Sequence, residues 1–338
     1  MNRVAVIGAG SWGTAFSLLL SRQGFSPRLW VREKEIYDSI VHRRVNDIFL
    51  PDFLIPAQVL PIQDLAGAIE ETEVIFVAVP SRFCRRAFSE MAPYLKPGQV
   101  VVSLTKGIEE GTLMRMTEIM TTVFPPEVEL AVISGPSFAR EVAAGLPTAV
   151  VCASRAPEVA GRVQRYLSGL NFRVYTSSDV IGVELAGAVK NVIAIAAGIS
   201  DGLGLGHNAR ASLITRGLFE TARLGLTLGA KQETFLGLAG IGDLVLTCTG
   251  HLSRNYQIGL QLSQGKSLSE ILAGMKMVAE GVSTAISVNQ LALREKVEMP
   301  ICQEVYQVLY EKKDPRSSLA DLMSRTLKAE GLNLPANS

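Results

Sequence analysis

The sequence near the amino terminus reads Val4-Ala-Val-Ile-Gly-Ala-Gly-Ser-Trp-Gly13, four apolar residues followed by glycines at a GxGxxG spacing. The apolar run is typical of a buried β-strand, and residues 14–23 are typical of a helix. A glycine turn between such a strand and helix lets backbone approach a pyrophosphate at the helix amino terminus. The sequence therefore predicts a dinucleotide site made by Gly8, Gly10, Ser11, Trp12 and Gly13. The alternatives are a coincidental turn and, for Trp12, simple packing against the sheet.

Short apolar runs alternate with helical stretches as far as residue 178. The runs are 3–7, 27–31, 74–79, 99–104, 129–134, 148–153 and 171–175. Several are apolar at nearly every position, as expected where helices cover both faces of a parallel sheet. We therefore predict an α/β fold for residues 1–178, a doubly wound sheet that binds the dinucleotide.

The strand pattern stops after Ser178, and the remaining residues predict successive helices separated by turns. Ser267-Leu-Ser-Glu270 and Ser318-Leu-Ala-Asp321 fit the capping box, in which a hydroxyl and a carboxylate satisfy free amides at a helix start. We predict that residues 179–338 form an all-α domain that carries the substrate and catalytic groups.

Composition excludes several classes of function. Lys+Arg 33 against Asp+Glu 32 gives a net charge of +1, which argues against a nucleic-acid partner. The four cysteines are scattered without a CxxC pair, and there are only three histidines, so we expect no metal. Residues 4–21 are uncharged, but the glycines within them favour a strand turning into a helix over a membrane segment. We expect no integral membrane segment.

The choice of dinucleotide depends on the tip of the second strand, where an acidic residue would bind a ribose 2′-hydroxyl. Here Trp30-Val31 is followed by Arg32 and then Glu33. A guanidinium at this point favours the 2′-phosphate of NADP, so we expect NADP to be preferred and NAD to remain usable. The alternative for Arg32 is a solvated surface charge.

Lys190 is the strongest candidate for chemistry in the second half of the chain. Apolar residues crowd it on both sides in Leu185-Ala-Gly-Ala-Val-Lys-Asn-Val-Ile-Ala194. Desolvation of an ammonium lowers its pKa toward the range of a general base near neutral pH. A lysine that reaches the surface along its apolar stem is the alternative.

A phosphate site is predicted where Arg254 and Asn255 open a helical stretch. The planar fork of an arginine and the free amides of a helix start can hold a phosphate together. The alternative is a surface helix cap. Thr105-Lys-Gly107, Ser134-Gly-Pro-Ser-Phe-Ala139 and Leu238-Ala-Gly-Ile-Gly-Asp-Leu244 likewise combine reactive residues with glycine.

Taken together, these motifs resemble one enzyme family. Gly8-Ala-Gly-Ser-Trp-Gly-Thr-Ala15, residues 105–107, 134–139, Gly187-Ala-Val-Lys-Asn-Val-Ile-Ala194, 240–244, 246–249, 253–255 and Glu298-Met-Pro-Ile301 occur in the family's order. The chain is similar to bacterial NAD(P)-dependent glycerol-3-phosphate dehydrogenases over residues 3–330. The resemblance implies a Rossmann domain followed by a helical domain like the carboxy-terminal domain of 6-phosphogluconate dehydrogenase.

The resemblance also implies roles for individual residues. Lys190 matches the proton acceptor, and Lys106 matches a lysine that touches both cofactor and substrate. The remaining implied substrate contacts are Gly135, Ser137, Asp243, Ser253, Arg254 and Asn255. The remaining implied cofactor contacts are Ala139, Arg254, Val278 and Glu280, with Arg32 a less secure transfer because family members differ there.

The implied activity is the interconversion of sn-glycerol 3-phosphate and dihydroxyacetone phosphate, in a cytoplasmic enzyme that supplies phospholipid synthesis. Lys190 would exchange the C2 hydroxyl proton while a hydride moves between C2 and the nicotinamide. We expect a homodimer, for which apolar stretches such as 281–293 offer either core or subunit contacts. The alternatives are a dehydrogenase of the same architecture with another hydroxy substrate and a nucleotide sensor without catalysis.

Overall fold

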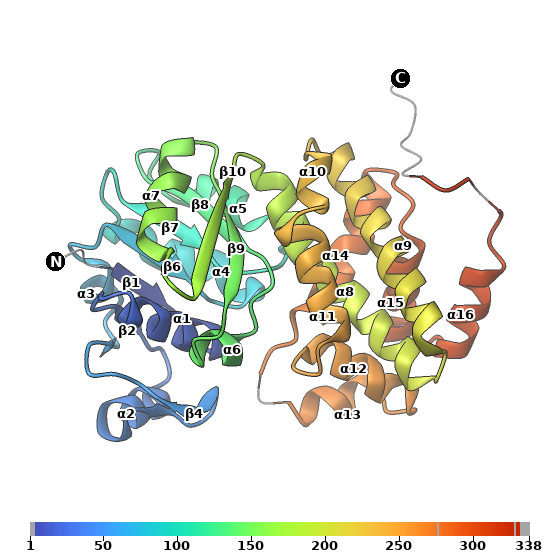
Figure 1. The fold of residues 1–338 in the computed structure, drawn as a ribbon, viewed down its shortest axis with the longest axis horizontal. Helices are drawn as coiled ribbons and strands as arrows, with labels where there is room; N and C mark the ends of the chain where they lie inside the picture. Colours follow the sequence, from blue (N-terminus) through green and yellow to red (C-terminus); the bar gives the residue numbers. More distant parts are fainter. Residues whose placement is uncertain (1–3, 276, 328, 332–338) are drawn as a thin grey trace. The chain divides into compact units, whose positions relative to one another are not determined.

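A computed structural model describes residues 4–275, 277–327 and 329–331. The chain divides into two compact units, shown in Figure 1. The first comprises residues 1–105 and 115–180, and the second comprises residues 106–114 and 181–338. The second unit thus contains a short segment, Lys106–Met114, that lies far from the rest of it in the sequence.

The first unit is built on an eight-stranded sheet in the order β10-β9-β8-β7-β6-β1-β2-β5. Its strands are β1 (Val4–Ile7), β2 (Arg28–Trp30), β5 (Leu60–Ile62), β6 (Val74–Val77), β7 (Val100–Ser103), β8 (Glu129–Ser134), β9 (Thr148–Ala153) and β10 (Phe172–Ser177). Every residue of β1, β6 and β7 is buried, which requires cover on both faces of the sheet. The predicted α/β fold is confirmed. The first residue of the predicted run 3–7 lies outside the described residues.

Helices connect these strands. They are α1 (Ser11–Arg22), α2 (Lys34–Arg43), α3 (Leu65–Ile69), α4 (Ser81–Met91), η1 (Ala92–Tyr94), α5 (Met116–Val123), α6 (Ala139–Ala143) and α7 (Pro157–Leu167). A second, two-stranded sheet pairs β3 (Val45–Asn46) with β4 (Leu50–Leu54). Phe16 of α1 lies in the core with Phe76 of β6, and their ring centroids are 4.8 Å apart.

The sheet is mixed, whereas the sequence pattern suggested a parallel one. β8 and β9 are antiparallel, and β10 is parallel to β9. The physical reason lies in the connection from β8 to β9, whose helix α6 has only five residues. Arg22 of α1 holds that helix by donating hydrogen bonds to the carbonyl oxygens of Val142 and Ala143. The chain therefore turns back instead of crossing over the sheet.

The second unit contains helices in all its described elements. They are α8 (Val180–Gly202), α9 (Gly206–Thr227), α10 (Gln232–Phe235), the π-turn η2 (Leu238–Gly242), α11 (Asp243–Thr249), α12 (Arg254–Ser263), α13 (Leu268–Ala273), α14 (Glu280–Arg294), α15 (Pro300–Tyr310) and α16 (Pro315–Met323). Among the described residues, α8 is a helix long and apolar enough to cross a membrane, but 94% of its apolar window is buried within the protein. It is a core helix.

One of the two predicted capping boxes is confirmed and the other is wrong. The Ser267 hydroxyl accepts from the Glu270 N–H, and the Glu270 carboxylate accepts from the Ser267 N–H at the start of α13. Ser318 instead lies inside α16, whose cap is Asp314. Asp314 followed by a proline at the first helical position is the stronger start signal, because the proline lacks an N–H that would need a partner.

Candidate active site

The three glycines of the first turn lack a side chain for different reasons. Gly8 has φ +109°, and a Cβ there would lie 2.8 Å from the Ala78 oxygen. A Cβ on Gly13 would lie 1.8 Å from the Gly8 oxygen, so this glycine allows the helix to approach the strand. Gly10 has φ −70°, and a Cβ there would meet nothing within 4 Å. The fold itself does not require a glycine at position 10, and the open space suits close approach of a phosphate to the backbone.

Several predicted residues of the first unit lie at one edge of the sheet. Gly8 follows β1, Arg32 lies two residues after β2, and Gly135 follows β8. These strands belong to the mutually parallel part of the sheet, so their carboxyl ends meet at the same edge. The strand order reverses direction between β6 and β1, and such a switch point is where α/β sheets bind nucleotides.

The other predicted residues of this unit have local contacts. The Ser11 hydroxyl donates to the Phe49 oxygen at 2.7 Å, and the Trp12 ring packs edge-on against Phe16. The Ser137 hydroxyl donates to the Gly135 oxygen at 2.9 Å, and Gly135 has φ +141°. Ala139 is the first residue of α6, and Arg32 is exposed to solvent.

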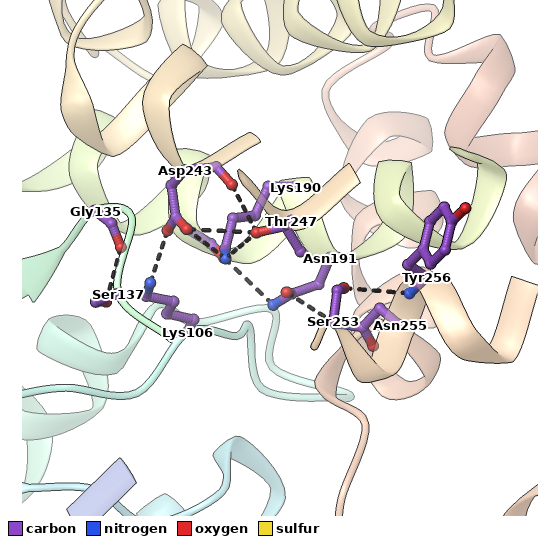
Figure 2. A network of polar contacts seen from close by, with 11 residues as sticks. Lys106, Gly135, Ser137, Lys190, Asn191, Asp243, Thr247, Ser253, Asn255 and Tyr256 are labelled. Atoms are coloured by element: carbon purple, nitrogen blue, oxygen red, sulfur yellow. Dashed lines mark hydrogen bonds and ion pairs between the residues drawn. The ribbon is translucent and has the colours of Figure 1, made fainter. Parts of the chain in front are cut away.

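Lys190, in the second unit, is held by two side chains of α11 (Figure 2). Its Nζ lies 2.7 Å from the Asp243 Oδ1 and 2.7 Å from the Thr247 Oγ1. The other carboxylate oxygen of Asp243 lies 2.7 Å from the Nζ of Lys106. Lys190 is 7% exposed and Asp243 is 1% exposed. The alternative that Lys190 reaches the surface is therefore wrong.

Burial lowers the pKa of Lys190 to about 8. The negative charge of Asp243 raises this pKa, and the positive charge of Lys106 lowers it, but burial is the largest influence. The ammonium thus remains paired while losing its proton more readily than an exposed lysine. A group with a pKa near neutral can both take and return a proton.

The local backbone places Asp243 at this point. The π-turn η2 precedes α11, and a Cβ on Gly240 within it would lie 2.1 Å from the Phe235 oxygen. The chain can therefore fold tightly back on α10 before α11 begins at Asp243. Thr247 lies one helical turn later, where its hydroxyl donates to the Asp243 main-chain oxygen at 2.6 Å and accepts from Lys190.

An amide ladder joins α8, α12 and α14 next to Lys190. The Asn255 Nδ2 donates to the Asn191 Oδ1 at 2.9 Å, and the Gly281 N–H donates to the Asn255 Oδ1 at 3.0 Å. Both asparagines are buried. The ladder fixes the amino terminus of α12 beside the residue that follows Lys190, as Figure 2 shows.

The start of α12 also brings together three predicted cofactor contacts. Arg254 Nη1 donates to the Val278 oxygen at 2.7 Å, and the Glu280 carboxylate interacts electrostatically with the same guanidinium. Ser253 is the cap of α12, because its hydroxyl accepts from the Tyr256 N–H at 3.3 Å. The predicted helix start at Arg254 is confirmed, and a phosphate role for it stays a prediction.

Thr247 and Asn191 also belong to this group of contacts around Lys190, although the sequence predicts no role for either residue. A signal for Thr247 was present, since it lies four residues after Asp243 and would share its face of a helix. Asn191 directly follows Lys190, but only the tertiary structure shows that its amide faces Asn255. The second unit therefore offers a poised amine, a carboxylate and an arginine at a helix start, a set suited to a phosphorylated hydroxy compound.

Comparison with known proteins gives a consistent result along the chain. Family models described as NAD-dependent glycerol-3-phosphate dehydrogenase N-terminus and C-terminus match residues 3–160 and 179–320. The chain is 53% identical over 335 residues to a glycerol-3-phosphate dehydrogenase, NAD(P)+, of Geobacter sulfurreducens, covering 97% of this chain and 99% of the relative. It is 51% identical to a protein of the same name from Syntrophobacter fumaroxidans, covering 97% of each. A crystal structure of glycerol-3-phosphate dehydrogenase from Coxiella burnetii superimposes with a TM-score of 0.92 at 42% identity, covering 96% of this chain and 99% of that one.

Proposed function

The chain belongs to the NAD-dependent glycerol-3-phosphate dehydrogenase family, and from that premise we propose that it interconverts sn-glycerol 3-phosphate and dihydroxyacetone phosphate with Lys190 as the proton-exchanging group. The observation that carries the proposal is the buried Lys190–Asp243–Thr247 cluster. A lysine with a pKa of about 8 is suited to proton transfer at neutral pH.

The geometry around Lys190 directs the proton. A tetrahedral amine nitrogen has four corners, and here one is the bond to Cε while two point to Asp243 and Thr247. The fourth corner is the place for the reacting proton. In oxidation the neutral amine takes the proton of the C2 hydroxyl, and in reduction the ammonium gives a proton to the C2 oxygen as it becomes an alkoxide.

A nicotinamide cofactor bound at the glycine turn would supply the hydride chemistry at C2 in both directions. The pyrophosphate of the cofactor is proposed to bind at the glycine turn, to Gly8, Gly10, Ser11, Trp12 and Gly13. Arg32 is proposed to contact the 2′-position. The further proposed cofactor contacts are Lys106, Ala139, Arg254, Val278 and Glu280. The open space at Gly10 supports this assignment.

The phosphate of the substrate is proposed to bind at the start of α12. Arg254 retains donors beyond the one bonded to the Val278 oxygen, and Asn255 is held in place by Asn191 and Gly281. Binding energy at this remote anion would position C2 near Lys190. The further substrate contacts that we propose are Gly135, Ser137, Lys106, Asp243 and Ser253.

Replacement of the lysine tests the proposal. We expect Lys190→Met to lose more than about a hundredfold in kcat for dihydroxyacetone phosphate reduction while it still binds NADPH, because removal of a general acid or base costs about 10²–10⁴-fold. The matched control is Lys313→Met, since Lys313 is also an ion-paired lysine of the second unit but pairs with Glu304 and Asp321. Turnover of Lys190→Met within tenfold of the wild type would remove the proposed role.

Preference for NADP is a separate proposal that depends on Arg32. Its exposed guanidinium follows the second strand of the sheet and is available to a 2′-phosphate. We expect Arg32→Ala to raise the KM for NADPH by about tenfold and leave the KM for NADH within about twofold, a loss typical of one charged contact. Initial rates measured over a range of NADPH and NADH concentrations give the ratio of the two KM values. If Arg32→Ala leaves this ratio unchanged, the proposed role of Arg32 is contradicted.

We also propose that the protein is a cytoplasmic enzyme that supplies glycerol 3-phosphate for phospholipid synthesis.

We propose in addition that the protein is a homodimer, whose mass in sedimentation would be twice the chain mass of 36.4 kDa. Within α14, Gly281, Ala285 and Leu291 are buried in the second unit, whereas Leu293 is 70% exposed. The apolar stretch 281–293 therefore lies mainly in the core, and Leu293 is its most exposed apolar residue.

A further inference from the structure

Asn46 is a buried amide that joins three parts of the first unit around the glycine turn. Its Nδ2 donates to the Ala9 oxygen at 2.8 Å and to the Thr14 Oγ1 at 2.9 Å. Its Oδ1 accepts from the Phe49 N–H at 3.1 Å. The side chain is 0% exposed, so water does not compete for these bonds.

The bond to the Ala9 oxygen has a directional consequence for the turn. Ala9 and Gly10 share one peptide unit, in which the C=O and the N–H point in opposite directions because the peptide is trans and planar. Asn46 holds the C=O on its own buried side. The N–H of Gly10 is therefore turned to the opposite side, and position 10 is where the turn has open space.

A second hydrogen bond ties the same loop to the turn. The Ser11 hydroxyl donates to the Phe49 oxygen at 2.7 Å, so Phe49 is held by Asn46 at its N–H and by Ser11 at its C=O. The segment 46–49 thus supports the strand-to-helix turn from one side.

We propose that Asn46 is a positioning residue for the dinucleotide, which fixes the Gly10 N–H in the direction that meets the pyrophosphate. The proposal rests on the proposed cofactor role of the turn. It involves no contact between Asn46 and the cofactor. It assigns to Asn46 a share of cofactor affinity that is common to NADP and NAD, because both carry the same pyrophosphate.

The test compares Asn46→Ala with a matched variant, Gln99→Ala. Gln99 is also buried in the first unit, and its Nε2 donates to the oxygens of Thr72 and Ile69 while its Oε1 accepts from the Lys96 N–H. It precedes β7, whereas the glycine turn follows β1, so it lies at the opposite edge of the parallel strands. The two alanine variants remove equivalent hydrogen bonds at different distances from the turn.

We expect Asn46→Ala to raise the dissociation constants of NADPH and NADH by about tenfold each, measured by calorimetric titration. The KM for each cofactor should rise to match, and kcat at saturating cofactor should stay within about twofold. Gln99→Ala should lower the melting temperature to a similar extent but leave both dissociation constants unchanged. If Asn46→Ala does not fold, Asn46→Ser, which keeps a hydroxyl for one of the three partners, should show a rise of about threefold.

Unchanged cofactor affinity in Asn46→Ala or Asn46→Ser would overturn the proposal, as would an equal loss in Gln99→Ala. A change in the ratio of NADPH to NADH affinity would also overturn it, because that ratio depends on the 2′-position and not on the pyrophosphate. A wild-type protein that binds NADPH without reducing dihydroxyacetone phosphate would refute the proposed activity. The dissociation constants would still decide the role of Asn46.

Discussion

Lys190 lies between opposing influences that together set its chemistry. Burial lowers its pKa, Asp243 raises it, and Lys106 lowers it again. Asp243 bonds to both lysines through separate oxygens, so its one negative charge is shared between two ammonium groups. A carboxylate paired with Lys190 alone would favour the ammonium, so Lys190 would keep its proton. A buried ammonium with no counter-charge would destabilise the folded protein. The carboxylate shared with Lys106 places the pKa of Lys190 between these two cases.

The pH dependence of the reaction should follow from this arrangement. With the Lys190 pKa at about 8, the oxidation rate should rise as pH increases through 8, because the base form is needed. The reduction rate should fall over the same range, because the ammonium is needed. The part of the pH–rate profile near pH 8 where the rate changes, here called the limb, should move to higher pH in Lys106→Met. It should move to lower pH in Asp243→Asn, even though both variants lose activity.

Profiles of kcat against pH in both directions measure the limb, whose position does not depend on the absolute rate. Lys313→Met, which alters an ion-paired lysine outside the cluster, should leave the limb where it is. A limb that moves the same way in Lys106→Met and Asp243→Asn would show that another group titrates.

Some features of the site residues can be predicted from the sequence, and others depend on the tertiary structure. The apolar neighbours of Lys190 predicted a desolvated amine, but they could not decide whether the side chain turns inward, because that depends on α11. Ser253 was predicted as a substrate contact through resemblance, and the structure shows that it caps α12. Pairings such as Asn191 with Asn255 join residues far apart in the chain, so no local pattern reports them.

At the scale of elements, the site depends on how closely α12 approaches α8. A Cβ on Gly198 would lie 2.0 Å from the Tyr256 oxygen, and a Cβ on Gly259 would lie 2.1 Å from the Ile195 oxygen. The two helices therefore touch through their backbones. This close crossing fixes the point along α8 at which Asn255 meets Asn191. It thereby also fixes the position of the start of α12.

Gly259→Ala should therefore disturb the proposed phosphate site at the start of α12. The added methyl has to push α12 away from α8, and overpacking of this kind costs about 1–3 kcal/mol of stability. We expect a rise of about tenfold in the KM for dihydroxyacetone phosphate, with the dissociation constant of NADPH changed much less. Steady-state kinetics and chemical denaturation measure the two effects.

The control for this variant is Gly161→Ala in α7. A Cβ on Gly161 would meet only the flexible end of Arg165, at 3.6 Å. An alanine in such a helical position is worth about 0.5–1 kcal/mol over glycine, so this variant should be neutral or slightly more stable. An unaltered KM in Gly259→Ala would mean that α12 does not depend on the crossing.

The order of elements was largely predictable because hydrophobic periodicity is a local property. The predicted runs 74–79, 129–134 and 148–153 contain β6, β8 and β9. The direction of β9 was not predictable, since it depends on how the chain from 135 to 147 packs through Arg22. The strands β3 and β5 gave no clear pattern because they have only two and three residues, and β4 gave none because Leu50 is its one buried residue.

At the scale of the whole molecule, the two units are not two halves of the sequence. The predicted boundary at 178/179 lies close to the last division between the units, after Val180. The segment 106–114, however, belongs to the second unit. Its Ile108 lies in the apolar core of that unit, and the Ser287 hydroxyl donates to the Ile108 oxygen at 3.1 Å. No composition change marks this segment, so the sequence alone did not assign it.

The fragment 179–338 should consequently be incomplete. We expect it to melt at a lower temperature than the same fragment carrying residues 105–115 on a flexible linker, because Ile108 fills part of its core. The matched control carries the same linked segment with Ile108→Asp, which places a charge where the core is apolar. Equal melting temperatures for all three, measured by calorimetry, would contradict a structural role for the segment.

The chain passes from one unit to the other after Thr105, after Met114 and after Val180. A single cut therefore cannot yield a nucleotide half and a substrate half that are each whole. A chimaera that grafts residues 179–338 onto a foreign dinucleotide-binding protein would arrive without the Lys106 ammonium that shares Asp243. Recombination between members of this family should yield a stable protein only when residues 106–114 and the helices of the second unit come from the same parent.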